Sequence, residues 1–141
     1  MSNEVAQAQA EVIEEFAFFD DWMDRYQYII DMGKRLAPMP DGERSEDNRI
    51  RGCQSQVWMV AEPDGERLNI RATSDAAIVS GLIAILLRIY SGRHPQDILD
   101  TPPDFVAGLG LEEHLSPTRS NGLASMLAAI RRYAEEAVEA A

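Results

Sequence analysis

The sequence predicts an α+β domain over residues 1–141, with a small antiparallel sheet of about three strands and helices packed on one of its faces. Three observations predict this class. Apolar residues recur at helical spacing near both ends of the chain, two β-forming segments flank a short turn near its middle, and a long apolar segment follows them. With 141 residues, 45% of them hydrophobic, the chain is large enough to bury one core without a metal or a disulfide.

Two helices are predicted to open the chain. Apolar residues from Val5 to Phe19 recur at helical spacing, which predicts an N-terminal helix within residues 1–19. Asp20 and Asp21 are candidate caps for a second helix that ends near Gly33. Residues 36–48 are rich in proline, glycine and charge, and we expect a loop there.

The middle of the chain predicts a β-hairpin. Residues 57–61 are a compact run of β-formers, residues 62–66 are typical of a turn, and residues 68–73 alternate between apolar and polar side chains. This alternation indicates a second strand with one buried face. A third, short strand is expected around residues 48–50, and Trp58 is expected in the core.

The second half predicts helices. Residues 76–90 are apolar on nearly every side, which indicates a buried central helix, and residues 73–75 offer candidate caps for it. Gly81 costs this helix about 1 kcal/mol relative to alanine, and close packing on the sheet would explain it. Prolines between 95 and 103 predict short helical turns, and the last helix is expected to start with Ser116 as cap and Pro117 in its first turn.

Charge and composition exclude several classes of function. The net charge of −11 argues against nucleic acid as a partner, because phosphate binding relies on clustered Lys and Arg. The acidic excess lies mainly before residue 48 and is interpreted as solvated helical surface. No signal peptide is expected, and the longest apolar run, over residues 76–90, is too short for a membrane span. A cytoplasmic location fits a free thiol.

Cys53 is the only cysteine, and its neighbours are unusual for a core thiol. It follows Gly52 and precedes the polar triplet Gln54, Ser55 and Gln56. A single cysteine excludes an internal disulfide, and with two histidines it provides too few ligands for a zinc or iron–sulfur site. Gly52 leaves room for another backbone or an active site to approach the sulfur.

The reactivity of this thiol is open from the local sequence alone. Arg49 and Arg51 are close enough in the chain to lower its pKa, yet isolated cysteines are often inert core residues. A cysteine hydrolase would need His94 or His114 beside the sulfur. A two-cysteine redox mechanism is excluded, and no motif supports a one-cysteine peroxidase. Sulfur carriage needs the least apparatus, because the thiolate only has to attack the outer sulfur of a partner persulfide.

Four segments resemble one family. They are GCQSQVW (52–58), preceded by Asn48, then SDAAIVSGLIA (74–84), HPQDIL (94–99) and HLSPTRSNGL (114–123). In this order and spacing they are similar to the SufE family of sulfur acceptors. The resemblance implies an α+β fold like that of the IscU/NifU scaffold proteins. It also implies a cytoplasmic sulfur acceptor, monomeric or homodimeric, with no cofactor of its own.

The family resemblance also implies a mechanism and a site. Such proteins activate a PLP-dependent cysteine desulfurase of the SufS type, accept its persulfide sulfur on the motif cysteine, here Cys53, and pass it to the Suf iron–sulfur scaffold. Gly52 and residues 54–56 belong to the motif loop, which is expected to tuck the thiol into an apolar cavity. Asp75 and Arg119 match positions implicated in holding or releasing that loop and in partner contact.

Alternatives to these assignments stay open. Asp75 is also a candidate helix cap, and Arg119, whose charge is unfavourable near a helix N-terminus, is also a candidate for an ion pair. The paralogous CsdE proteins share the GC…VW frame but differ between its ends. A non-catalytic adaptor that binds through its acidic helices, with Cys53 inert, is the alternative from another class.

Overall fold

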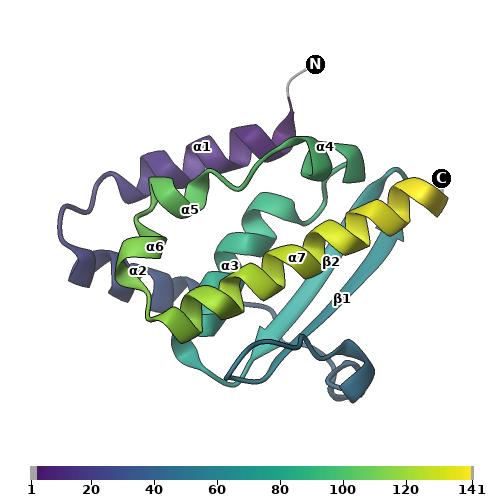
Figure 1. Cartoon of the computed structure of the whole chain (residues 1–141), viewed down its shortest axis with the longest axis horizontal. Coiled ribbons are helices and arrows are strands. Elements are labelled where there is room, and N and C mark those ends of the chain that lie inside the picture. The colour runs from purple at the N-terminus through teal and green to yellow at the C-terminus, as the bar shows by residue number, and fades with distance from the viewer. Residues whose placement is uncertain (1–2, 141) are drawn as a thin grey trace.

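The computed structural model describes residues 3–140 (Figure 1). Its elements are α1 (Glu4–Phe16), α2 (Trp22–Lys34), β1 (Val57–Asp64), β2 (Arg67–Ser74), α3 (Ala77–Tyr90), α4 (Pro95–Asp100), α5 (Phe105–Gly108), α6 (Leu111–His114) and α7 (Pro117–Ala140). Two short 3-10 turns, at Asp41–Glu43 and Glu46–Asn48, lie in the loop before β1. The α+β class and the order of the predicted elements are therefore confirmed, although α1 ends before Phe19.

Among residues 3–140 the sheet has two strands, β1 and β2. The prediction of a third strand around residues 48–50 is therefore wrong. β1 and β2 pair antiparallel, with Val57 opposite Ser74 and Asp64 opposite Arg67. The segment before β1 forms only an isolated bridge between Arg49 and Trp58, supported by a 2.8 Å bond from the Ile50 N–H to the Val57 carbonyl. Gly52, at a φ of 90°, then turns the chain away from β1, which ends the pairing.

The two faces of the hairpin have different surroundings. Val57, Met59, Ile70 and Ala72 are buried on the inner face, which packs against the helices. Trp58 lies on the opposite face and is only half-buried, so its expected place in the core is wrong. The outer face also carries Arg71, which forms ion pairs with Glu43 and Glu62 at 2.5 Å.

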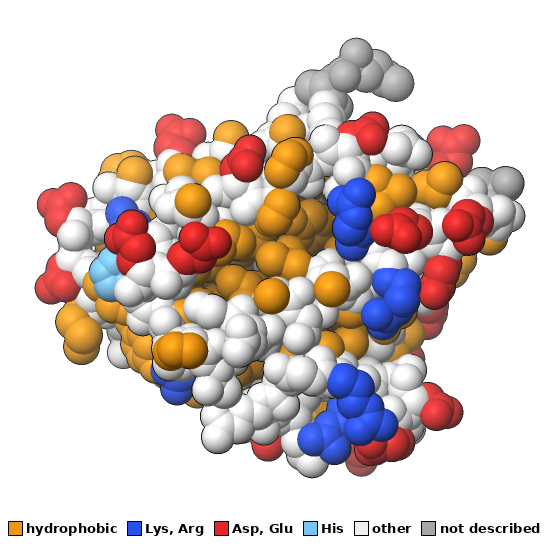
Figure 2. Space-filling view, in the orientation of Figure 1, with side chains coloured by type: hydrophobic (Ala, Val, Ile, Leu, Met, Phe, Trp, Pro, Cys, Tyr) orange, Lys and Arg blue, Asp and Glu red, His pale blue; other side chains and the backbone are white. Residues whose placement is uncertain are grey.

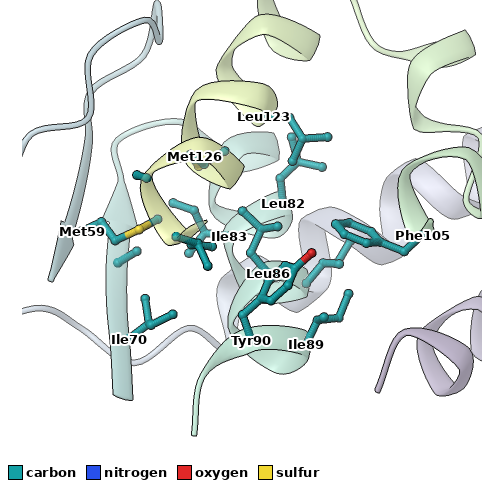
Figure 3. Close-up of a cluster of buried hydrophobic side chains, with 14 of the residues drawn as sticks. Met59, Ile70, Leu82, Ile83, Leu86, Ile89, Tyr90, Phe105, Leu123 and Met126 are labelled. Atoms are coloured by element: carbon teal, nitrogen blue, oxygen red, sulfur yellow. The ribbon is translucent and has the colours of Figure 1, made fainter. Parts of the chain in front are cut away.

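α3 is the centre of the core. It contacts α1, α2, β2 and α7 (Figure 1). Its buried side chains meet those of the hairpin and of α7, as Figure 3 shows for Met59, Ile70, Leu82, Leu86, Leu123 and Met126. α7 crosses over α3 and the sheet, and its first turns thereby come to lie beside the loop that leads into β1.

Gly81 explains how α2 and α3 approach so closely. A Cβ at Gly81 would overlap the Ile29 carbonyl of α2, and a Cβ at Gly33 would lie 2.6 Å from the Gly81 nitrogen. The close packing that the sequence indicated is therefore real, but its partner is α2 and not the sheet.

The helix starts agree with the sequence in most cases. Asp21 caps α2 through the Met23 N–H at 3.0 Å, and the Ser116 hydroxyl accepts the Arg119 N–H at 3.3 Å, as expected of a cap for α7. In the part of the chain that the structure describes, no helix combines the length and the apolar character that crossing a membrane requires.

Candidate functional site

Cys53 lies on the loop over residues 51–56, against the side of α7. Its side chain is half-buried, and its Sγ lies 3.6 Å from the Gly122 carbonyl, to which the thiol donates. A Cβ at Gly122 would lie 3.5 Å from Sγ. The sulfur thus packs directly against α7 at Gly122, where a methyl group would meet it at an ordinary contact distance and a larger side chain would displace it.

Gly52 fits the same helix surface. Its positive φ of 90° is a conformation that other residues adopt only with strain, and a Cβ at this position would overlap the Ser125 hydroxyl of α7. The space that the missing Gly52 side chain leaves is therefore occupied by Ser125 of α7.

The thiol opens on a cavity of about 330 Å³. Four buried apolar side chains form one part of its lining, namely Val79, Leu82, Leu123 and Met126. More exposed polar side chains form the rest, namely Gln54, Ser55, Ser116, Thr118 and Arg119. The cavity therefore combines an apolar wall, which shields a sulfur atom, with a polar opening to solvent.

Burial controls the acidity of this thiol. The pKa of Cys53 is raised above its ordinary value because the apolar surroundings disfavour the thiolate. Arg49 and Arg51 do not offset this effect, since both lie against Glu46, at 3.9 and 3.0 Å. The local sequence leaves the effect of these arginines on the thiol pKa open, and in the structure burial is the cause of the shift.

Asp75 holds the end of the cysteine loop. Its Oδ1 accepts the Gln56 N–H at 3.1 Å, and its own N–H donates to the Gln56 carbonyl at 3.4 Å. It does not cap α3, because the N-cap position is Ala76, which makes no side-chain cap bond, and the hydroxyl of Ser74 accepts the Ala76 N–H. The structure thus brings Asp75 to the loop and not to the helix start.

Arg119 lies on the wall of the Cys53 cavity, in the first turn of α7. Its Nη1 donates to the Tyr26 hydroxyl of α2 at 3.5 Å, and among residues 3–140 it forms no ion pair. The guanidinium is thus an exposed positive charge beside the opening of the cavity.

Sequence reasoning missed three residues that shape this site, Tyr26, Gly122 and Ser125. Gly122 left a signal, since a glycine within a helix costs stability and often marks a close approach of another group. Tyr26 and Ser125 left none, because their roles follow from how α2 and α7 are placed.

The two histidines lie away from the sulfur. His114 stacks on Trp22 with ring centroids 4.3 Å apart, and His94 precedes α4. Neither lines the Cys53 cavity, which leaves the hydrolase alternative without a base. Within the described residues, no group of three or more His, Cys, Asp or Glu side chains is placed to hold a metal ion.

Comparison with known proteins places this chain among SufE-like sequences. The family model described as "SufE: Fe-S metabolism associated domain" matches residues 10–134. An uncharacterised SufE-like protein of Rhizobium meliloti (strain 1021) is 44% identical over 130 residues, which cover 89% of this chain and 93% of the relative. A second uncharacterised SufE-like protein, from Rhizobium etli, is 43% identical over 131 residues, covering 89% and 88%.

A solved structure shares the fold. The solution structure of a hypothetical protein from Thermus thermophilus aligns with a TM-score of 0.78 at 25% identity, over 94% of this chain and 96% of that one. The family match covers most of the residues that form the core and the whole cysteine loop. The chain therefore belongs to the SufE family, whose domain is associated with iron–sulfur metabolism.

Proposed function

We propose that this protein accepts sulfur from a PLP-dependent cysteine desulfurase of the SufS type and activates that enzyme. Cys53 is the acceptor, and its sulfur passes on to the Suf iron–sulfur scaffold. The observation that carries the proposal is a solitary thiol placed on a loop beside an open cavity, in a chain of the SufE family. The PLP belongs to the desulfurase.

The reaction needs no oxidant. Cys53 loses its proton, and the thiolate attacks the outer sulfur of the persulfide on the desulfurase. One S–S bond forms between Cys53 and that sulfur while the S–S bond of the donor breaks, and the donor cysteine leaves as a thiolate. Because one sulfur bond replaces another, electrons balance and the sulfur stays at its oxidation level.

The resting site explains why a partner is required. The raised pKa keeps Cys53 in the thiol form, which is a poor nucleophile. Contact between the sulfur and Gly122 also blocks part of the approach to it. A desulfurase that draws the loop out of the cavity would remove both restraints. Burial between deliveries also slows oxidation of the thiol.

The roles of the other site residues follow from their contacts. Gly52 and residues 54–56 form the loop that carries the thiol, and Asp75 anchors its end. Arg119 supplies a positive charge near the place where the persulfide anion arrives. One cysteine suits a carrier rather than a scaffold that holds a cluster. The likeness to the IscU fold, the cytoplasmic location and the oligomeric state stay predictions.

Mixing the protein with the desulfurase of the same organism and cysteine tests the proposal. Sulfide release should rise, and Cys53 should gain the mass of one sulfur atom. A wild-type chain that gains no sulfur, or a Cys53→Ser chain that gains as much, would overturn the proposal. Stimulation that persists undiminished with Cys53→Ser would favour the adaptor alternative.

Two further comparisons refine the assignment. Offering both a SufS-type enzyme and its CsdE-partnered paralogue identifies which desulfurase is served. Arg119→Ala is expected to reduce stimulation of the desulfurase more than it reduces thermal stability. Among residues 3–140 the Arg119 side chain makes one long hydrogen bond, to the Tyr26 hydroxyl at 3.5 Å, and its backbone bond to Ser116 survives the change. Parallel losses of both would indicate a structural role for Arg119.

A further inference from the structure

A second apolar surface runs along the other flank of α7. Two adjoining cavities of about 280 and 160 Å³ share Pro103 and Leu127 in their linings. We name them together the α7 groove, whose apolar lining includes Pro103, Val106, Ala107, Leu123, Ala124 and Leu127. Figure 2 shows hydrophobic side chains gathered in a hollow at the middle of this face. Exposed apolar hollows of this kind mark interaction sites.

The shape of the α7 groove fits an elongated partner segment. The α7 residues that line it run from Ser120 to Arg131, which corresponds to roughly 16 Å of helix. Ala107 and Ala124 are exposed and small, so they leave space for larger side chains of a partner. An amphipathic helix places apolar anchors at such spacing, on successive turns of one face.

The charge around the groove selects among such helices. Asp104 and Glu112 line it, are exposed, and have no ion-pair partner within residues 3–140. Acidic side chains border the left of the hollow in Figure 2. Arg131, at the far end, lies 3.5 Å from Glu135. The net charge of −11 adds to this field, so the groove favours a segment with Lys or Arg beside its apolar face.

The α7 groove and the Cys53 cavity adjoin. Leu123 lines both, because the first turns of α7 separate them. A protein that delivers sulfur must bring its persulfide into bonding distance of Cys53. A partner seated at the Cys53 cavity that also extends across the first turns of α7 would reach the groove past Leu123.

We propose that the α7 groove docks a basic amphipathic helix of the sulfur-donating desulfurase. The apolar face of that helix lies on Ala124 and Leu127, and its basic residues lie over Asp104 and Glu112. The choice of this partner rests on the proposed sulfur-acceptor function. The groove supplies affinity and orientation, while the cysteine loop alone moves to react.

Binding measurements on full-length chains test this docking site. All variants carry Cys53→Ser, so that covalent capture does not contribute, and are titrated with the desulfurase by calorimetry. Ala124→Trp fills the groove from an exposed helix position and should weaken binding about tenfold or more. Glu136→Trp, exposed on the same helix outside the groove, should change it less than about twofold.

Charge reversal provides the second arm. The double variant Asp104→Lys and Glu112→Lys should weaken binding at low salt, and the difference from wild type should shrink as salt screens it. Reversing Glu136 and Glu139 to lysine changes the net charge equally at a distance from the groove. Equal weakening by both double variants would overturn a local role for the acidic border.

The outcomes separate this proposal from the proposed function. If wild-type Cys53 accepts sulfur and Ala124→Trp binds as wild type, the groove proposal fails and the function stands. If Ala124→Trp loses binding but the wild type never gains sulfur, the function fails and the docking site stands. If sedimentation shows a homodimer that Ala124→Trp dissociates, the groove holds a second copy of this chain and the proposal is overturned.

Discussion

Removing the carboxylate of Asp75 should release the cysteine loop. Asp75 Oδ1 accepts the Gln56 N–H at 3.1 Å, which leaves that end of the loop pinned beside β1. Asp75→Ala deletes the acceptor, whereas Asp75→Asn keeps an oxygen in the same place. The alanine variant should therefore expose Cys53 more often, and the asparagine variant should stay close to wild type.

The size of the effect follows from one hydrogen bond. A typical bond of this kind contributes about 1 kcal/mol, which corresponds to a roughly fivefold change in the ratio of open to closed loops. When opening is fast compared with the chemical step, the alkylation rate of a buried thiol follows the open population. Cys53 in Asp75→Ala should then react with iodoacetamide about five times faster than in the wild type.

Alkylation is followed by mass spectrometry at one pH, with unfolded protein as the reference for intrinsic thiol reactivity. Thermal unfolding of the same samples shows whether the whole fold has weakened. Equal rates for the wild type and Asp75→Ala would refute the pinning role. Equal acceleration in Asp75→Ala and Asp75→Asn would refute the importance of the acceptor oxygen.

Three further predictions follow from the packing. Gly122→Val should displace Cys53 and speed its alkylation, whereas Gly122→Ala should leave the rate unchanged, because a Cβ lies at an ordinary 3.5 Å from the sulfur. Gly81→Ala should destabilise the fold by about 1–3 kcal/mol in urea unfolding, because its methyl group would overlap α2. Gly42→Ala, with open space around it, is the control, and an equal loss there would contradict the reasoning. The raised pKa of Cys53 favours the neutral thiol in the folded state. The free energy of unfolding should therefore be highest below the ordinary thiol pKa of about 8.5. It should fall as the pH rises from there through the higher pKa of the folded state. A slope of this sign that is unchanged in Cys53→Ser would contradict the assignment to this thiol.

The sequence predicts most helices of the fold because their apolar periodicity is strong. The alternation from Leu68 to Thr73 likewise predicts which face of β2 is buried. The third strand fails as a prediction because pairing at Arg49 ends where Gly52 turns the chain, and no local pattern reports where pairing stops. The prediction that Trp58 lies in the core is wrong because strand register determines which side of β1 faces the helices.

The site is only partly predictable. Cys53 stands out in the sequence as a lone thiol in polar company, and the family motif indicates its loop. The pKa of that thiol is not predictable from its neighbours in the chain, because Arg49 and Arg51 pair with Glu46 while distant residues of α3 and α7 bury the sulfur. The position of the two arginines in the sequence is compatible with a lowered thiol pKa, whereas burial in the folded chain raises that pKa.

The bond from the Ile50 N–H to the Val57 carbonyl limits how far the sulfur can travel. It joins the residues on either side of the segment 51–56, so that Cys53 lies on a loop whose two ends are held together at Ile50 and Val57. Cys53 is three residues from Ile50, and an extended chain covers at most about 3.6 Å per residue. If this bond is kept, Cys53 can move only on the order of 10 Å from Ile50. Under the proposed function, a sulfur donor would have to bring its own sulfur within this distance. The entrance to the donor's active site would then have to lie close to the surface around β1.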